Sequence, residues 1–290
     1  MTFQKKLDLA IEKNNSLLCV GLDSAIEKLP PQFTKKDYPQ FAFNKWIIEQ
    51  THDLVCAYKP NSAFYEARGA DGIRELQMTV HYIKKHYPDI LIILDAKRGD
   101  IGSSNKGYIK YAYEYIGADA ITLHPYLGKE SLMPFLDIKD KGCIILCRTS
   151  NPESGEFQNL MCHSELDSES RKKTGSRIPP EAGRRVGDDN ELYKVVAKNI
   201  VDLWNKNKNC LLVVGATYPK ELSEIRKIVG DMTLLIPGIG AQGGDVRATV
   251  KAGLNSQGKG IIINSGRGII FSKNPGKEAE KLKDEINEYR

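Results

Sequence analysis

The sequence predicts a (β/α)8 barrel, in which eight parallel strands close into one sheet and helices cover its outside. Eight short runs recur along the chain that are nearly all apolar and together rich in Val, Ile and Leu. Strands of this kind are buried on both faces, which is typical of a parallel sheet covered by helices. The segments between the runs carry apolar residues at helical spacing. Eight such units within about 250 residues correspond to one barrel of ordinary size.

The expected elements follow one another in order along the chain. A helix at 3–13 precedes the first strand as an addition to the barrel. The expected strands are 17–22, 54–60, 90–95, 120–124, 142–147, 210–216, 233–238 and 260–265. Helical spacing recurs at 41–54, 73–87, 106–118, 192–206 and 221–230. We therefore expect a single barrel domain over residues 1–290.

An open, doubly wound sheet is the alternative arrangement of alternating strands and helices. Such a sheet normally carries a glycine-rich turn directly after its first strand, whereas VGLDSAIEKLPP follows here. The barrel is therefore the favoured architecture. The segment 254–260 before the last strand is longer than a turn needs, and the sequence does not reveal its role.

Residues 161–189 do not continue the alternation of strand-like and helical segments. The segment MCHSELDSESRKKTGSRIPPEAGRRVGDD contains six basic and six acidic residues and almost no large apolar side chain. A segment of this composition cannot bury enough apolar surface to offset its ordering entropy. We therefore expect a largely disordered insertion after the fifth strand, within the barrel domain.

The composition excludes several classes of function. The 42 basic and 37 acidic residues give a net charge of +5, and the basic residues are scattered, which is unlike a nucleic-acid-binding face. No apolar run approaches the roughly 18 residues that a membrane span requires. The opening MTFQKKLDLAIEKNN mixes lysines and acids where a signal peptide would have an apolar core. We expect a cytoplasmic protein that binds neither nucleic acid nor membrane.

Cysteine and histidine give no sign of a metal site. The six cysteines include no CxxC pair, and five of them lie in or beside apolar runs. The five histidines show no ligand spacing such as HExxH. We expect buried reduced thiols and no zinc site.

Charged residues stand at the ends of three consecutive buried strands. Asp23 follows the first strand, Lys59 ends the second, and LDAKRGDIG places Asp95, Lys97 and Asp100 at the end of the third. In a barrel these ends converge on one concave mouth, where catalytic residues lie. Since side chains alternate along a strand, Asp95 and Lys97 are expected to project into this mouth together.

Two other interpretations of these charges remain open. An ion pair could simply close the top of the barrel, but such a pair needs two charges and not four. Asp95 and Asp100 could hold a magnesium ion, although two nearby lysines oppose a cation. Charged arrays of this kind are typical of functional sites.

Two glycine-rich loops follow the last two strands, as PGIGAQGGD at 237–245 and NSGRGIIF at 264–271. Loops at these two positions form the phosphate site common in barrel enzymes, where backbone N–H groups meet the anion. Arg267 lies beside the second loop and could bind a phosphate through two hydrogen bonds. The pair of loops predicts a phosphorylated ligand.

With Asp23, Lys59, DAKRGDIG, RTSNP, PGIGAQGGD and SGRGI in place, the chain resembles the orotidine 5′-phosphate decarboxylase family, and its longer, bacterial-type branch in particular. The resemblance covers nearly the whole chain apart from about 161–189. It implies a cofactor-independent decarboxylation of orotidine 5′-phosphate to UMP in de novo pyrimidine biosynthesis. It also implies a homodimer whose active sites are shared across the interface.

The resemblance assigns a role to each matching residue. Lys97 resembles the proton donor to C6 of the pyrimidine, with Lys59, Asp95 and Asp100 as its partners and Asp100 reaching the site of the other subunit. The implied substrate-binding residues fall into four groups. They are Asp23 with Lys59 for the ribose hydroxyls, Ser150 for the pyrimidine edge, Gln242, Gly266 and Arg267 for the phosphate, and Ile101 with Ser104 for the partner's site.

Two alternative functions remain. One is a magnesium-dependent phosphosugar decarboxylase or synthase of the same superfamily, which would keep the DxKxxD element. The other is a non-catalytic barrel that senses nucleotides. The RTSNP and GAQGGD elements favour the pyrimidine reaction over the first, and the four charged residues at the mouth favour an enzyme over the second.

Overall fold

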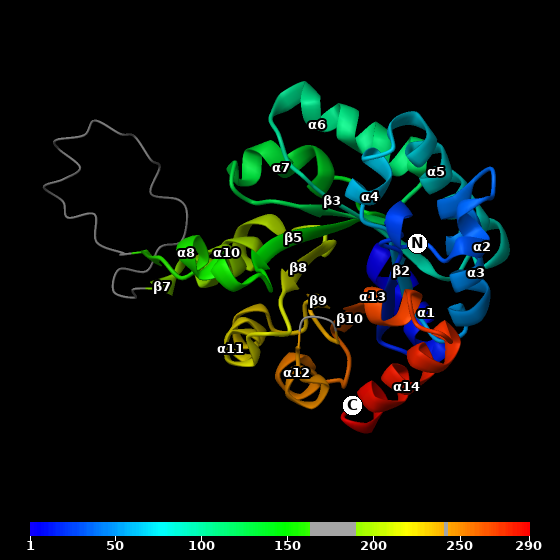
Figure 1. Ribbon diagram of the computed structural model, residues 1–290. Helices are drawn as coiled ribbons and strands as arrows, with labels where there is room; N and C mark the ends of the chain where they lie inside the picture. The colour runs from blue at the N-terminus through cyan, green and yellow to red at the C-terminus, as the bar shows by residue number, and fades with distance from the viewer. Residues whose placement is uncertain (163–189, 241–242) are drawn as a thin grey trace, which may run out of the picture.

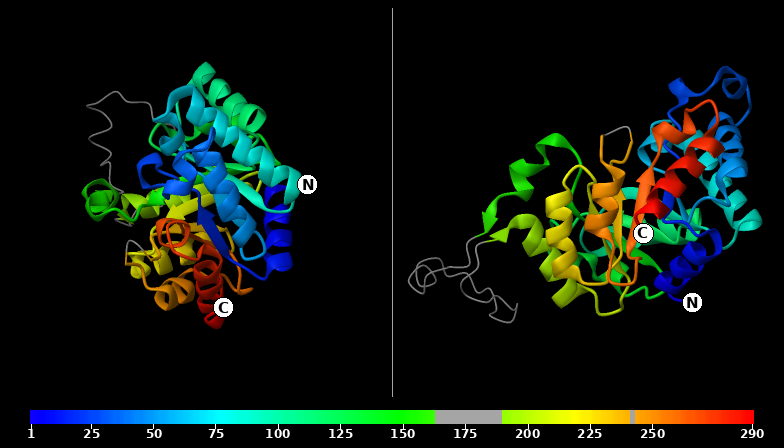
Figure 2. Two further views of the ribbon diagram at one scale, coloured as in Figure 1. Left: turned by 45° about the vertical axis from the view of Figure 1, so that its right-hand side comes forward. Right: turned by 90° about the horizontal axis from the view of Figure 1, so that it is seen from below.

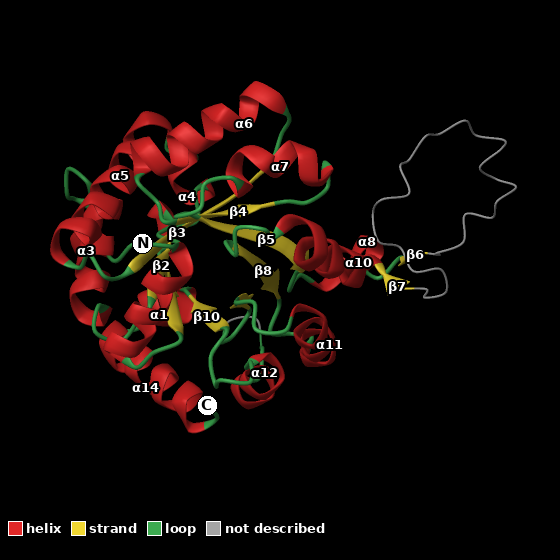
Figure 3. Ribbon diagram, turned by 180° about the vertical axis from the view of Figure 1, so that it is seen from behind, coloured by secondary structure: helices red, strands yellow, loops and turns green. Residues whose placement is uncertain are grey.

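The computed structural model describes residues 1–162, 190–240 and 243–290. Its centre is a closed barrel with the strand order β1-β10-β9-β8-β5-β4-β3-β2, and every neighbouring pair is parallel. Helices surround the strands on all sides (Figures 1 and 3). The strands are β1 Leu18–Gly21, β2 Ala57–Lys59, β3 Leu91–Arg98, β4 Ala120–Leu123, β5 Gly142–Arg148, β8 Cys210–Val214, β9 Leu234–Pro237 and β10 Ile261–Ser265. The predicted (β/α)8 barrel is therefore confirmed, and the open sheet is excluded.

Helices are found at every segment where the apolar spacing predicts one, and further helices lie between these segments. The longer ones are α1 Phe3–Asn14, α3 Pro39–Thr51, α5 Gly69–His86, α6 Gly102–Ile109, α7 Gly128–Leu136, α10 Leu192–Asn199, α11 Pro219–Val229, α12 Val246–Gly253 and α14 Pro275–Glu288. Short helices occupy the connections as η1 Ile26–Lys28, α2 Pro31–Thr34, α4 Ala63–Glu66, η3 Pro152–Ser154, α8 Gly155–Gln158 and α13 Arg267–Ile270. Two helices widen into π-turns at their ends, at η2 Lys110–Ile116 and η4 Ile200–Trp204.

Helix α1 closes the N-terminal end of the barrel. Phe3 is buried there, against the position of Gly142 where β5 begins. Lys6 forms an ion pair of 2.8 Å with Asp119, the residue before β4. The chain start and α1 lie at one end of the barrel in Figure 2. The opposite end, where the strands point, is therefore the one left for a site.

The cysteines are all free, and five are buried. Burial raises the pKa of Cys56, Cys147 and Cys210 to about 12. Such thiols stay protonated at neutral pH and are poor nucleophiles. Among the described residues, no helix is long and apolar enough to cross a membrane, and no group of three His, Cys, Asp or Glu side chains could hold a metal ion.

The segment 161–189 begins with residues that the structure describes. Met161–Cys162 forms β6, which pairs antiparallel with β7 at Asn190–Glu191. This small ladder lies beyond α8 and α10 at the side of the barrel (Figure 1). Backbone pairing needs no apolar side chain, so composition did not predict it. The expected disorder of 163–189 concerns residues outside the described part of the chain.

Residues 254–260 form an organised turn before β10. The Asn255 side chain accepts hydrogen bonds from the backbone N–H groups of Gln257 and Lys259, at 3.0 and 2.9 Å. Gly258 and Gly260 have φ of +66° and +80°, which glycine adopts without strain. The Arg226 guanidinium donates to the Gly260 carbonyl at 2.7 Å. This turn therefore fixes the start of β10, the strand that leads to the predicted phosphate loop.

Candidate active site

Three of the predicted charges meet at the mouth of the barrel. The Asp95 carboxylate lies between two ammonium groups, with Oδ2 at 2.8 Å from Lys59 Nζ and Oδ1 at 2.7 Å from Lys97 Nζ. The side chains of Lys59 and Asp95 are 5% and 12% exposed, while that of Lys97 is 50% exposed. The array therefore has a buried inner half and one ammonium group that faces the open mouth.

Strand β3 continues past its neighbours to present this array. An isolated bridge between Asn61 and Asp95 extends the pairing of β2 and β3 beyond Lys59. The Asp95 N–H donates to the Pro60 carbonyl at 3.0 Å. The expected convergence of Asp95 and Lys97 is found, but regular alternation is not its cause. The register shifts between Leu94 and Arg98, and Lys97 has a φ of +46°.

A left-handed lysine is strained, at a cost of roughly 1–2 kcal/mol. Strand β4 holds it in place, because the Thr122 hydroxyl accepts from the Lys97 N–H at 2.9 Å and donates to Asp95 Oδ1 at 2.9 Å. His124 Nε2 lies 2.9 Å from the Gly99 carbonyl. Sequence reasoning missed both residues. The sequence contains a signal for them, because Thr122 and His124 alternate with apolar residues in the strand AITLH.

The charges shift the pKa values of the buried pair in opposite directions. Burial alone would raise the pKa of Asp95, but Lys59 and Lys97 outweigh it and hold this pKa well below its usual range. Burial would likewise lower the pKa of Lys59, and the carboxylates of Asp95 and Asp23 outweigh it and raise that pKa. Asp95 is therefore an anion and Lys59 a cation at neutral pH. Both oxygens of Asp95 are already engaged.

Asp23 lies at the edge of the array. Its Oδ1 is 4.0 Å from Lys59 Nζ, and it is buried without a hydrogen bond from any described residue. A buried acceptor without a donor is costly unless something else supplies one. Asp23 is thus placed to receive a hydrogen bond from a ligand in the mouth.

Asp100, Ile101 and Ser104 do not join the array within one chain. Asp100 forms no ion pair with any described residue, and its carboxylate accepts from the Ile101 N–H at 2.7 Å. The Ile101 side chain is 63% exposed, and Ser104 is also exposed. Ser104 lines a shallow surface pocket of about 540 Å³ with Arg98 and Tyr108. Ile101 and Ser104 therefore face outward from the barrel, and Asp100 beside them is partly buried.

The loop after β5 carries Ser150 and is packed from behind. Its carbonyl accepts from the Thr217 hydroxyl at 3.3 Å. A Cβ on Gly215 would lie 2.7 Å from the Ser150 Cα, so only glycine permits this close approach. Both contacts come from the loop after β8, which fixes the position of Ser150 at the mouth.

Arg148 organises the same loop from below. It is 2% exposed, it hydrogen-bonds Ser154 Oγ, and Gln158 Oε1 lies 3.3 Å away. Its guanidinium stacks 3.8 Å above the centre of the Tyr218 ring. Gln158 also accepts from the Thr149 N–H at 2.9 Å. Arg148 has no carboxylate partner among the described residues, so the ring and these amide and hydroxyl oxygens hold its charge.

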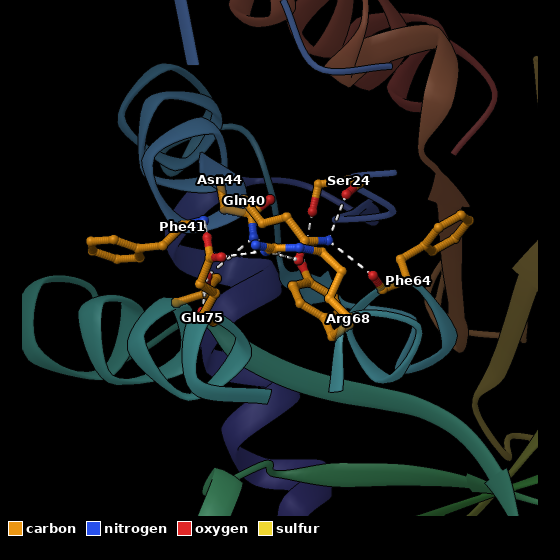
Figure 4. A network of polar contacts seen from close by, with 9 residues as sticks. Ser24, Gln40, Phe41, Asn44, Phe64, Arg68 and Glu75 are labelled. Carbon is orange, nitrogen blue, oxygen red and sulfur yellow. Dashed lines mark hydrogen bonds and ion pairs between the residues drawn. The ribbon is translucent and has the colours of Figure 1, made fainter. Parts of the chain in front are cut away.

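A buried polar network supports the first two strand ends (Figure 4). Gln40 Nε2 donates to the carbonyls of Ser24 and Phe64, at 2.7 and 3.0 Å. Arg68 hydrogen-bonds Gln40 Oε1 at 2.9 Å and forms an ion pair with Glu75, whose side chain is 1% exposed. The network thus ties helices α3 and α5 to the residue after Asp23 and to α4, which follows Lys59.

The two glycine-rich loops that are predicted to bind phosphate are described in part. Gly266 precedes the short helix α13, and Arg267 begins it with an exposed side chain. A Cβ on Gly266 would lie 3.4 Å from Asp23 Oδ2, so this loop borders the array. Gln242 lies outside the described residues. The structure therefore brings Gly266 and Arg267 to the same mouth as Lys59, Asp95 and Lys97.

Comparisons with known proteins agree with this geometry. The model of the "Orotidine 5'-phosphate decarboxylase / HUMPS family" matches residues 16–176 and 181–282, so its break is shorter than the segment 161–189. A protein of Cellvibrio japonicus named orotidine 5′-phosphate decarboxylase is 47% identical and covers 94% of this chain and 91% of its own. One of Ralstonia pickettii with the same name is 42% identical over 100% of both chains. The solved OMP decarboxylase of Leishmania donovani is 36% identical with a TM-score of 0.81, over 100% of this chain and 98% of its own.

Proposed function

The chain belongs to the orotidine 5′-phosphate decarboxylase / HUMPS family, and we infer that it is a lyase that decarboxylates orotidine 5′-phosphate to UMP in pyrimidine biosynthesis. Curated relatives at 42% and 47% identity carry the decarboxylase name. The observation that carries the reaction is the ion-paired array of Lys59, Asp95 and Lys97 at the barrel mouth.

The array suits a decarboxylation that no ring system assists. When the bond from C6 to the carboxylate breaks, its electron pair stays on C6 and CO₂ leaves. A fixed cation stabilises this developing charge without reorganisation. We assign that role to Lys97, which then donates a proton from Nζ to C6. Its side chain is 50% exposed, so solvent can return the proton.

Asp95 is proposed to have two roles in this step. Its charge disfavours the substrate carboxylate in the ground state, which is a form of ground-state destabilisation. It also holds Lys59 and Lys97 at 2.8 and 2.7 Å. Asp95 is therefore a catalytic residue that both positions the proton donor and opposes the group that leaves.

The rest of the substrate is proposed to follow the strand ends around the mouth. Asp23 and Lys59 bind the ribose hydroxyls, which is supported by the unpartnered Asp23 Oδ1. Ser150 meets the pyrimidine edge, and Gly266, Arg267 and Gln242 bind the phosphate. Phosphate binding away from C6 can then stabilise a closed arrangement in the transition state. No cofactor enters this scheme.

We propose that two subunits complete each site. Asp100 has no ion pair with a described residue of its own chain, and Ile101 is largely exposed beside it. Asp100, Ile101 and Ser104 would then enter the site of a second copy across a two-fold axis. This arrangement would cover the pocket that Ser104 lines. We propose a cytoplasmic homodimer.

The direct test is the loss of orotidylate absorbance with purified protein, measured with and without EDTA. We expect turnover that the chelator does not change. A magnesium-dependent reaction would require a cation at Asp95, whose two oxygens are occupied by lysines. Absence of turnover, or turnover abolished by EDTA, would exclude the proposal.

A nucleotide-sensing barrel is the other alternative, and Lys97→Ala separates it from the enzyme. We expect this variant to lose turnover and still bind UMP, because Lys97 is the exposed member of the array. A sensor would show no turnover in the wild-type protein.

A further inference from the structure

Asn264 is a buried polar side chain inside the barrel. It is 8% exposed, and its Oδ1 accepts no hydrogen bond from any described residue. It lies in β10 after three isoleucines, in a strand that is otherwise packed into the core. Buried amide groups almost always find partners, so this one requires an explanation.

The register of the sheet places Asn264 on the inner face of the barrel. It pairs with Cys19 of β1, and Cys19 pairs with Ala57 of β2. Register partners in parallel strands point to the same face, and residues two apart also share a face. Ala57 therefore shares its face with Lys59, whose Nζ meets Asp95 in the mouth. Asn264 thus points into the barrel beneath the array.

Two oxygens without a hydrogen-bond donor lie around the position that a Gly21 side chain would occupy, next to the Gly266 backbone. A Cβ built on Gly21 would lie 3.6 Å from Asn264 Oδ1 and 3.6 Å from Asp23 Oδ1. Each of these oxygens is buried and accepts no hydrogen bond from the described residues. Two acceptors around one point are suited to a group with two adjacent donors.

The charge around these two oxygens limits which ligand groups can bind between them. Lys59 Nζ lies 4.0 Å from Asp23 Oδ1, so a second cation between the two oxygens is disfavoured. A neutral vicinal diol fits, because its neighbouring hydroxyls can donate one hydrogen bond to each acceptor. The substrate carries such a diol on its ribose.

We propose that Asn264 binds one ribose hydroxyl of the nucleotide and acts as the partner of Asp23 in recognising the diol. This proposal rests on the proposed function and adds a specificity-determining residue to it. The bound nucleotide would then donate the hydrogen bond that Asn264 Oδ1 lacks among the described residues.

The test compares nucleotides that differ only in the diol. Dissociation constants are measured by calorimetry for UMP, 2′-deoxy-UMP and 3′-deoxy-UMP with the wild-type protein and Asn264→Ala. We expect the variant to bind UMP about tenfold more weakly, the effect of one hydrogen bond of about 1.4 kcal/mol. For one of the two deoxynucleotides, wild type and variant should bind equally, because the hydroxyl that Asn264 meets is already missing.

Thr249→Val is the matched control. The Thr249 hydroxyl is also buried and unpartnered among the described residues, but it lies on the outer helix α12. This variant should bind all three nucleotides as the wild type does. Melting temperature is measured for both variants, and Asn264→Ala should melt at or above the wild-type temperature.

Two results would overturn the proposal. One is an unchanged affinity of Asn264→Ala for UMP. The other is an equal loss for all three nucleotides, especially with a lower melting temperature, which would indicate a structural role. Failure of the proposed function has a separate signature, because the wild-type protein itself would neither turn over orotidylate nor bind UMP.

Discussion

At the scale of single residues, the stability of the mouth depends on Asp95. Among the described residues it is the nearest carboxylate to Lys59, with Asp23 at 4.0 Å as the next one. Asp95→Asn should therefore lower the free energy of unfolding by about 3 kcal/mol at pH 7, since it leaves a buried ammonium group with a weaker partner. Denaturant unfolding monitored by circular dichroism measures this difference.

The same variant has a defined pH dependence. The pKa of Asp95 is lowered in the folded protein. Its stabilisation is therefore fully present above the unfolded pKa of about 3.9, and it is lost as the pH falls through the lower folded value. The difference in the free energy of unfolding between wild type and Asp95→Asn should be equal at pH 7 and pH 5. At pH 3 this difference should be smaller by about 1 kcal/mol. A difference that is constant down to pH 3 would refute the assigned ion pairs.

Gly21 offers a second test at this scale. An alanine Cβ there would lie 3.2 Å from the Gly266 Cα and 3.6 Å from the oxygens of Asp23 and Asn264. The contact with Gly266 requires a backbone shift of a few tenths of an ångström, and the methyl group would lie between the two acceptors. We expect Gly21→Ala to fold and to bind UMP at least about tenfold more weakly, a loss of roughly 1.4 kcal/mol.

Calorimetry on Gly21→Ala, Asn264→Ala and the double variant checks this interpretation. Two changes that remove the same contact are not additive. The double variant should therefore lose little more affinity than Gly21→Ala alone. Fully additive losses would mean that the two residues act on different parts of the nucleotide.

At the scale of elements, the loop after β5 depends on Arg148. Replacing it with methionine removes the hydrogen bonds to Ser154 and Gln158 and the charge above the Tyr218 ring. Since Ser150 follows two residues later, we expect Arg148→Met to raise KM for orotidylate by about tenfold, through the loss of a positioned contact to the pyrimidine. Steady-state kinetics measures this change.

Tyr218→Phe is the control for that prediction. It keeps the ring under the guanidinium and removes only the hydroxyl, which lies 3.3 Å from the Asn151 carbonyl. Its KM should stay within about twofold of the wild-type value, because that hydrogen bond is exposed and weak. A large effect of Tyr218→Phe with none of Arg148→Met would assign the loop's order to the tyrosine hydroxyl.

Elements also show what the sequence could predict. The strands are nearly continuous apolar runs, so their number and order could be read directly, and the charges at their ends identified the mouth. Contacts between distant segments could not be read in this way. Thr122 holds Lys97 across 25 residues, and Gln40 supports the Phe64 carbonyl across 24. Asn264 looked like part of an apolar run until the register gave its facing direction.

At the scale of the whole molecule, the proposed dimer follows from the orientation of LDAKRGDIG. Asp95 and Lys97 turn into the mouth of their own barrel, while Ile101 and Ser104 are exposed on the outside. Three residues beyond Lys97, the Asp100 carboxylate accepts a backbone N–H and meets no cation of the described chain. A two-fold axis beside α6 would let each such segment serve two sites.

Mixing two inactive variants tests this arrangement. Lys97→Ala and Asp100→Asn should each have little activity, the first for want of a proton donor and the second because the partner's array lacks its carboxylate. In a mixed dimer, one site contains both changes and the other contains neither. If subunits exchange at random in an equal mixture, half of the dimers are mixed and each has one intact site of two, so activity should recover to about a quarter of the wild-type value.

Recovery should follow subunit exchange and disappear when the dimers are cross-linked before mixing. If Asp100 served its own chain, every site in the mixture would carry one of the two changes and no activity would return.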